Sequence, residues 1–208
     1  MFARFTGAAL TVALLAAGAA PAFCADEKID GHGPSRPIEA GRAKSRVCAA
    51  CHGPDGNAKA PGMPSIAGQP TMYTHWQLIK FRDGRRKNDQ MTQFVAKLTD
   101  EDMADLAAFY AAQTPTQRSA AKVDPQKVAD GKKAAAFYHC TSCHKADLSG
   151  NQQVPRLAGQ DLDYLKKLIR GFKERTASDL DGTMTMSAQP LREDDIEVLA
   201  HFAASLGQ

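Results

Sequence analysis

The chain has 208 residues, of which 43% are apolar, 24% are charged and 7% are aromatic. This length is enough for one large domain or two small ones. The formal net charge is only +3, which argues against a nucleic-acid partner, because such proteins usually present a strongly basic face. The apolar content allows a packed core, but a thin one for the chain's length. We therefore expect another group to fill part of the interior.

Residues 1–25 are typical of a secretory signal peptide, with Arg4 as the positive charge, an apolar run over 10–17 and small residues after it. The apolar run is well short of the roughly 20 residues that a membrane span needs. Cleavage after Ala22 and cleavage after Ala25 both fit the pattern. Removal of the segment leaves 25 basic and 23 acidic residues, a formal charge of +2.

The remainder of the chain is a repeat of itself. Cys48-Ala-Ala-Cys51-His52 and Cys140-Thr-Ser-Cys143-His144 lie 92 residues apart. Further residues recur at offsets of 91 to 93, namely Pro64, Ala67-Gly68-Gln69, Tyr73, Leu98, Asp102, Leu106 and Phe109 as Pro155, Ala158-Gly159-Gln160, Tyr164, Leu191, Asp195, Leu199 and Phe202. Two copies of one unit explain this pattern, and the boundary is expected near Arg118, which gives domains at 26–118 and 119–208.

Each copy is predicted to be helical, so the expected fold is all-α. Apolar residues at helical spacing predict the following helices: 73–82, 99–113, 162–173 and 193–206, with one further helix before each cysteine motif, from Ile38 and from Asp130. The stretches 53–62 and 145–153 are rich in turn-forming residues and are expected to be loops. Thr99 is a good N-cap, whereas Arg192 stands at the matching place in the second copy and predicts a weaker helix start.

Cys-x-x-Cys-His is a haem attachment signature. Two thiols on one helical turn can add to the two vinyl groups of a porphyrin, and the adjacent histidine then lies under the ring, where it can bind iron. The predicted cofactors are thus two covalently attached haem c groups, held by the four cysteines of the motifs and ligated by His52 and His144. A zinc site does not require a histidine after each cysteine pair, and a thioredoxin-like pair needs a strand-to-helix setting that the sequence lacks.

The sixth iron ligand is expected to be a methionine, the ligand that raises the potential of a cytochrome c. Met91 lies seven residues before Leu98, and Met184 lies seven before Leu191. The repeat thus selects Met91 and Met184, with Met186 as a rival in the same loop. Three histidines have no counterpart in the other copy, which argues against a second histidine ligand: His75, His139 and His201.

Pro64 and Pro155 occupy equivalent positions after the two motifs. A backbone carbonyl there could accept the Nδ1–H of His52 or His144 and so fix the tautomer of the iron ligand. An ordinary turn proline explains the pattern equally well.

The sequence at 48–57 (Cys-Ala-Ala-Cys-His-Gly-Pro-Asp-Gly-Asn), the two Pro-x-x-Ala-Gly-Gln segments and Leu-Thr-Asp-Glu-Asp at 98–102 resemble the two-haem class I cytochromes c, most closely the cytochrome c-four type. The resemblance covers nearly the whole chain after the signal peptide. It implies two tandem cytochrome c domains about a pseudo-two-fold axis, with His/Met ligation at both irons. It also implies an electron carrier of the periplasm that works between respiratory donors and a terminal oxidase or reductase. The chain departs from the pattern after its second motif, where Lys145-Ala-Asp-Leu replaces Gly-Pro-Asp-Gly.

The leading hypothesis is therefore an electron carrier with no substrate of its own, meeting redox protein partners through transient contacts. A di-haem peroxidase or gas-binding protein would need a vacant sixth site, and a subunit of a dehydrogenase or oxidase complex would share the same chemistry. Loose association with a membrane stays open. Four basic residues could meet an acidic partner, although a solvated helix end is favoured: Arg82, Arg85, Arg86 and Lys87.

Overall fold

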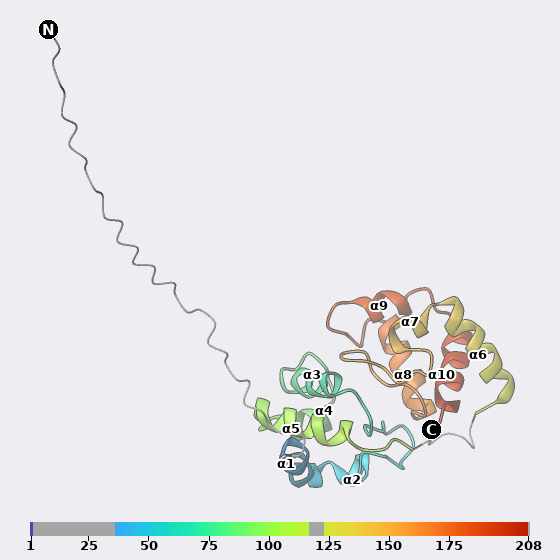
Figure 1. Cartoon of the computed structure of the whole chain (residues 1–208). Helices are drawn as coiled ribbons and strands as arrows, with labels where there is room; N and C mark the ends of the chain where they lie inside the picture. The colour runs from blue at the N-terminus through green and yellow to red at the C-terminus, as the bar shows by residue number, and fades with distance from the viewer. Residues whose placement is uncertain (2–35, 117–122, 208) are drawn as a thin grey trace. The chain divides into compact units, whose positions relative to one another are not determined.

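The computed structural model describes Met1 and residues 36–116 and 123–207, called here the first half (36–116) and the second half (123–207). Both halves fall within one compact unit, residues 32–208. The predicted signal peptide (1–25) and the predicted boundary near Arg118 lie outside the described residues. Figure 1 shows the helices, which run in the order α1 (Arg36–Lys44), a 3₁₀ turn (Ser45–Val47), α2 (Ala49–His52), α3 (Thr71–Arg82), α4 (Asp89–Val95), α5 (Asp100–Ala111), α6 (Pro125–Phe137), α7 (Cys140–His144), α8 (Leu162–Lys173), α9 (Thr183–Ala188) and α10 (Glu193–Ser205).

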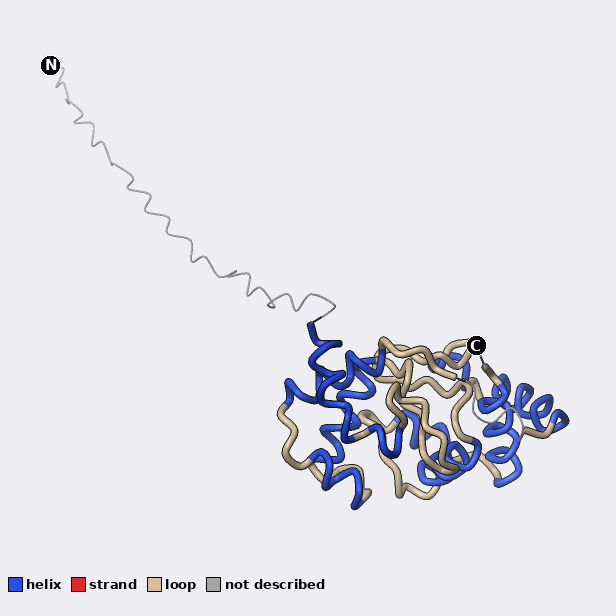
Figure 2. Tube along the Cα trace, turned by 90° about the horizontal axis from the view of Figure 1, so that it is seen from below, coloured by secondary structure: helices blue, strands red, loops and turns tan. Residues whose placement is uncertain are grey.

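The all-α prediction is confirmed. Among the described residues there is no β-strand, only an isolated bridge between Asn151 and Val154, and the tube in Figure 2 shows helices joined by long loops. Within the first half α1 and α3 pack on α5, and within the second half α6 and α8 pack on α10. The two halves therefore repeat one arrangement, as the sequence offsets predict.

The first and last helix of each half cross at a glycine. A Cβ atom added at Gly41 of α1 would lie 2.1 Å from the backbone oxygen of Asp105 in α5. A Cβ added at Gly131 of α6 would lie 2.0 Å from the backbone oxygen of Val198 in α10. A side chain at either position would force the helices apart, so both glycines are required for this close crossing.

The helix starts explain why these segments are helical. The Thr99 hydroxyl accepts from the Asp102 backbone N–H at 3.1 Å and the Asp102 carboxylate accepts from Thr99 N–H at 2.9 Å, a complete capping box for α5. Helix α10 has only the reciprocal half, in which the Asp195 carboxylate accepts from Arg192 N–H at 2.9 Å, because a guanidinium cannot accept a hydrogen bond. The weaker start predicted at Arg192 is thus confirmed.

Two predictions about element boundaries were wrong. Helix α6 begins at Pro125, five residues before the expected Asp130, because Asp124 caps it and proline suits the first helical position. The segment that carries Met184 was expected to be a loop but forms the short helix α9, and the segment that carries Met91, for which no element was predicted, forms α4.

The buried cores differ in size. The cluster of buried apolar side chains in the first half consists of Leu106, Phe109 and Tyr110. The corresponding cluster of the second half is larger, with members such as Leu165, Ile196 and Phe202. A thin side-chain core is confirmed most clearly in the first half, where an added apolar group has the most room to contribute.

The two halves contact each other through reciprocal glutamines. The Gln69 side chain accepts from Arg156 N–H at 3.0 Å and donates to Arg156 O at 2.8 Å. The Gln160 side chain accepts from Ser65 N–H at 2.8 Å and donates to Ser65 O at 2.7 Å. All four residues are buried, and both the glutamines and their partners are 91 positions apart. The contact therefore has the self-matching form of a two-fold interface.

Candidate functional site

A large cavity is lined by the residues that the sequence singled out. Its volume is about 990 Å³, and both cysteine motifs contribute to its wall. This volume lies at the upper end of the range of about 300–1,000 Å³ that is typical of small-molecule sites. The cavity is therefore large enough to accept a bulky prosthetic group.

Each motif histidine is buried and held in the same way. The Nδ1 atom of His52 lies 2.9 Å from Pro64 O, and that of His144 lies 2.9 Å from Pro155 O. A carbonyl oxygen can only accept, so Nδ1 carries the proton in both rings and Nε2 keeps its lone pair. Burial lowers the pKa of both imidazoles, an effect that the hydrogen bond to the proline carbonyl partly opposes. Each ring is thus neutral and oriented, which is the state in which histidine binds a metal.

The proline carbonyls settle an alternative left open by the sequence. Pro64 and Pro155 are more than turn residues, because their carbonyls fix the tautomers of the two motif histidines.

None of the four motif cysteines is paired in a disulfide, so all four sulfur atoms are available for attachment. Cys48 and Cys140 are partly buried, and burial raises the pKa of both thiols. Among the described residues no group of three or more His, Cys, Asp or Glu side chains could hold a metal ion by itself. The arrangement gives no support to the zinc alternative, which needs four thiolates around one ion.

The methionines separate into two groups. Met91 on α4 and Met184 on α9 are half-buried and line the cavity. Met186, the rival of Met184, is 74% exposed and does not line it. Met63 also lines the cavity, but Val154 stands at its matching position in the second half. Only Met91 and Met184 therefore offer a thioether at equivalent places in the two halves.

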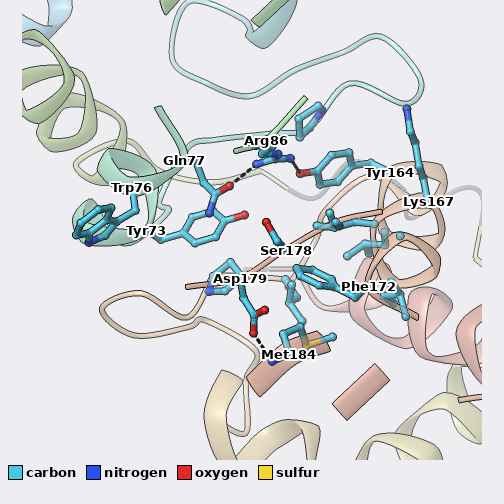
Figure 3. Close-up of a pocket in the computed structure, with 18 of the residues that line it drawn as sticks. Tyr73, Trp76, Gln77, Arg86, Tyr164, Lys167, Phe172, Ser178, Asp179 and Met184 are labelled. Atoms are coloured by element: carbon cyan, nitrogen blue, oxygen red, sulfur yellow. Dashed lines mark hydrogen bonds between the residues drawn. The ribbon is translucent and has the colours of Figure 1, made fainter. Parts of the chain in front are cut away.

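Two cations of the first half, Lys80 and Arg86, were not predicted as part of the site, although Arg86 lines the cavity. The guanidinium of Arg86 donates to the Tyr164 hydroxyl at 3.0 Å and to the Gln77 amide oxygen at 2.6 Å, as Figure 3 shows. It also stacks over the Phe81 ring, 4.6 Å from the centroid. Lys80 is only 2% exposed, and its ammonium donates to Ser178 O of the second half.

The sequence drew attention to two of the residues involved, Tyr164 and Arg86, but did not indicate that they contact each other. Tyr164 was recognised only as the repeat of Tyr73, and Arg86 only as one of four neighbouring cations. Arg82 and Arg85, at and just after the end of α3, form ion pairs near the surface instead, with Asp100 at 2.6 Å and with Asp83 at 3.0 Å. These contacts agree with the solvated helix end that the sequence favoured.

Comparison with known proteins agrees with this geometry. Residues 39–109 match the family model described as cytochrome c oxidase, cbb3-type, subunit III, and residues 128–207 match the model described as cytochrome c. Cytochrome c4 of Pseudomonas aeruginosa is 36% identical over 178 residues, which cover 80% of this chain and 87% of that protein. The chain belongs to the cytochrome c4 family.

A solved structure leads to the same family. The crystal structure of reduced recombinant cytochrome c4 from Pseudomonas stutzeri superposes with a TM-score of 0.74 at 32% identity, covering 81% of this chain and 98% of that one. A protein named thiosulfate dehydrogenase electron acceptor, from Stutzerimonas stutzeri, is 30% identical over 78% of this chain and 80% of its own length. This member of the cytochrome c4 family is thus an electron-transfer protein with two tandem cytochrome c domains and two covalently attached haem c groups.

The residues present fit two such groups. The cavity provides the volume, each half provides a buried neutral imidazole with an available Nε2, and each half provides one thioether on its wall. Within the described part of this chain, no helix is both long and apolar enough to cross a membrane.

Proposed function

We propose that the protein is a periplasmic electron carrier in which each half holds one haem c by its own motif. Cys48 and Cys51 would form the thioethers of the first half, and His52 and Met91 would ligate its iron. In the second half, the thioethers come from Cys140 and Cys143, and the axial ligands are His144 and Met184. We assign one haem to each of the two domains that the sequence repeat predicts, 26–118 and 119–208.

The observation that carries this proposal is the paired anchoring of His52 and His144. A carrier must change its charge by one electron with little rearrangement, so its ligands have to be held before and after the change. A proline carbonyl at 2.9 Å holds each ring in one tautomer, and burial lowers the pKa of each imidazole and so disfavours protonation of the free nitrogen. When bound, the haem iron supplies the one-electron chemistry, with a potential set by its axial ligands and surroundings.

The choice of Met184 over Met186 rests on burial. An axial ligand has to face the cavity, and Met184 lines it while the Met186 side chain is mostly in solvent. A methionine in each half leaves no vacant sixth position, which favours a carrier over a di-haem peroxidase or a gas-binding protein.

The proposed partners are redox proteins: a respiratory donor complex on one side and a terminal oxidase or reductase on the other. The likeness of residues 39–109 to an oxidase subunit family supports the oxidase side. The relative named as an acceptor for thiosulfate dehydrogenase supports a second candidate donor, a dehydrogenase of that class. Periplasmic location is supported by the signal-peptide pattern of residues 1–25.

The test is an optical spectrum of the haem-loaded protein, oxidised and reduced, with and without carbon monoxide. We expect the weak far-red band of thioether-to-iron ligation at both haems and no change on addition of carbon monoxide. Met91→Ala and Met184→Ala should each remove half of that band and open one iron to carbon monoxide, whereas Met186→Ala should change neither. Carbon monoxide binding to the unmodified protein would contradict the carrier function and favour a peroxidase or sensor.

A further inference from the structure

Each proposed methionine ligand has its own backbone N–H held by a side chain from the preceding segment. In the first half, the Asn88 amide oxygen accepts from Met91 N–H at 2.9 Å. In the second half, the Asp179 carboxylate accepts from Met184 N–H at 2.5 Å, and its other oxygen accepts from the Thr185 hydroxyl at 2.8 Å. Figure 3 shows the Asp179 contact beside the cavity.

The two side chains do the same task in helices that start differently. Asn88 is the N-cap of α4 and binds the third residue of that helix. Helix α9 has Gly182 at its N-cap, which has no side chain to offer, so Asp179 reaches in from three residues further back. At the offset of 93 that pairs Met91 with Met184, the counterpart of Asn88 is Asp181, so Asp179 takes over the contact from a different position of the repeat. Each half thus has a side-chain acceptor for its methionine N–H, neutral in the first half and charged in the second.

The charge difference lies close to the proposed iron ligand. An ionised carboxylate favours the oxidised, more positive iron, and its effect is strongest where solvent is excluded. A neutral amide has no such effect. A cation lies near Asp179: Lys80, which interacts electrostatically with the carboxylate and whose ammonium donates to the neighbouring Ser178 O. Lys80 reduces the effect of the carboxylate, and removal of the carboxylate charge still makes the surroundings of the iron more positive.

We propose that Asn88 and Asp179 are positioning residues for the thioethers of Met91 and Met184, and that the Asp179 carboxylate lowers the reduction potential of the haem held by the second half. This inference rests on the proposed function, because it takes Met91 and Met184 as the axial ligands. It assigns the same mechanical role to both side chains and an electrostatic role to Asp179 alone.

The experiment is a redox titration of the haem-loaded full chain, with the two haems distinguished by the NMR signals of their bound methionine methyl groups. Asp179→Asn keeps an oxygen for Met184 N–H, removes the charge, and replaces the oxygen that faces the Thr185 hydroxyl with an amide NH2, from which that hydroxyl can accept. We expect it to shift the reduction equilibrium of the second-half haem toward the reduced state by about threefold or more, which corresponds to about 28 mV for one electron. The first-half haem should shift less.

Two further variants complete the test. Asn88→Asp places the charge in the first half and should lower the potential of that haem. Asp181→Asn is the matched control, because Asp181 is an exposed acid of the same segment that accepts from Thr183 N–H instead of a methionine N–H. It removes an equal charge and should give a smaller shift than Asp179→Asn.

The positioning role is read from a different signal. Asp179→Ala should weaken the far-red thioether band of the second half alone, and Asn88→Ala that of the first half alone. An unchanged potential in Asp179→Asn, or a shift no larger than that of Asp181→Asn, would overturn the electrostatic role. Unchanged bands in both alanine variants would overturn the positioning role. If the unmodified protein has no thioether band at all, the proposed ligands themselves are wrong, and this result is distinct from either of the others.

Discussion

Replacement of Gly41 by alanine tests the helix crossing that frames the first half. The new Cβ would lie 2.1 Å from Asp105 O and 2.6 Å from the Phe109 Cβ, whereas real Cβ contacts are essentially never shorter than 3.0 Å. Helices α1 and α5 must therefore separate by about 0.9 Å. Overpacking of this kind costs about 3 kcal/mol at the upper end of its usual range, and alanine regains about 1 kcal/mol of helix propensity. The net loss of stability should be about 2 kcal/mol.

The assay is guanidinium unfolding of the haem-loaded protein, followed by far-ultraviolet circular dichroism and by haem absorbance. With a slope of about 4 kcal/mol per molar, the loss lowers the unfolding midpoint of the first half by about 0.5 M. The control is Gly171→Ala in α8, where the new Cβ meets nothing closer than 3.2 Å, so its midpoint should stay equal or rise. A Gly41→Ala midpoint equal to that of the control would refute the argument from close crossing.

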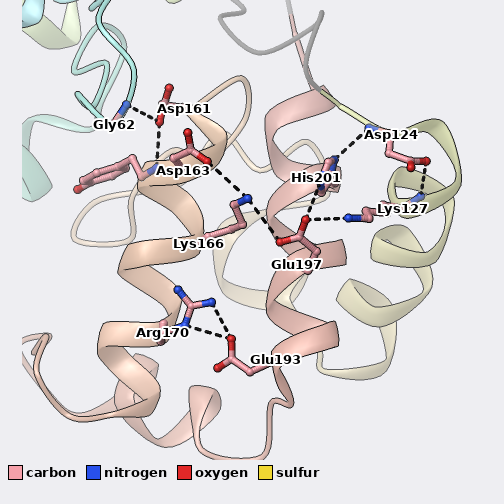
Figure 4. Close-up of polar contacts among 11 residues, drawn as sticks. Gly62, Asp124, Lys127, Asp161, Asp163, Lys166, Arg170, Glu193, Glu197 and His201 are labelled. Carbon is pink, nitrogen blue, oxygen red and sulfur yellow. Dashed lines mark hydrogen bonds and ion pairs between the residues drawn. The ribbon is translucent and has the colours of Figure 1, made fainter.

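Four further substitutions test the polar contacts. Glu197 accepts from Lys127 at 2.8 Å and lies beside the buried His201 (Figure 4), and these contacts lower its pKa to about 2. Its stabilisation is therefore complete above pH 4.5 and disappears as the pH falls toward 2. Glu197→Gln should be less stable than the unmodified protein at pH 7, with the difference vanishing over that window in acid titrations of unfolding; a constant difference would contradict the linkage. Thr99→Ala should cost about 1 kcal/mol in denaturant unfolding, and Arg192→Ala at the weaker cap of α10 should cost less than half of that. Gln69→Leu leaves two buried backbone groups of Arg156 without partners, so we expect a loss of about 2 kcal/mol or more and separate unfolding transitions for the two halves, while a single unshifted transition would argue against the glutamine contact.

Much of the fold and the site followed from the sequence because the repeat supplied an internal comparison. One copy alone would not distinguish Met91 from Met63 or Met103, whereas the shared spacing to Leu98 and Leu191 selects Met91 and Met184 as the proposed ligands. The long helices were predicted because their apolar faces repeat over several turns.

The features that the sequence did not predict have no periodic apolar face and no local pattern that would reveal them. Helices α4 and α9 have seven and six residues, too few turns for a periodic face, and they depend on acceptors such as Asn88 and Asp179. The burial of Lys80 could not be predicted, because a lysine is almost never fully buried without a partner and its partner, Ser178 O, lies 98 positions away. By contrast, the early start of α6 was visible in Asp124-Pro125, a standard cap followed by a standard first residue.

The reciprocal glutamines have a consequence for how the two copies could diverge. Gln69 and Gln160 bind only main-chain atoms of the other half, at Arg156 and Ser65. The side chains of Arg156 and Ser65 take no part in these hydrogen bonds, and they already differ in size and charge. Each copy can therefore accept substitutions at these two buried positions independently, while the glutamine contacts between the halves are kept.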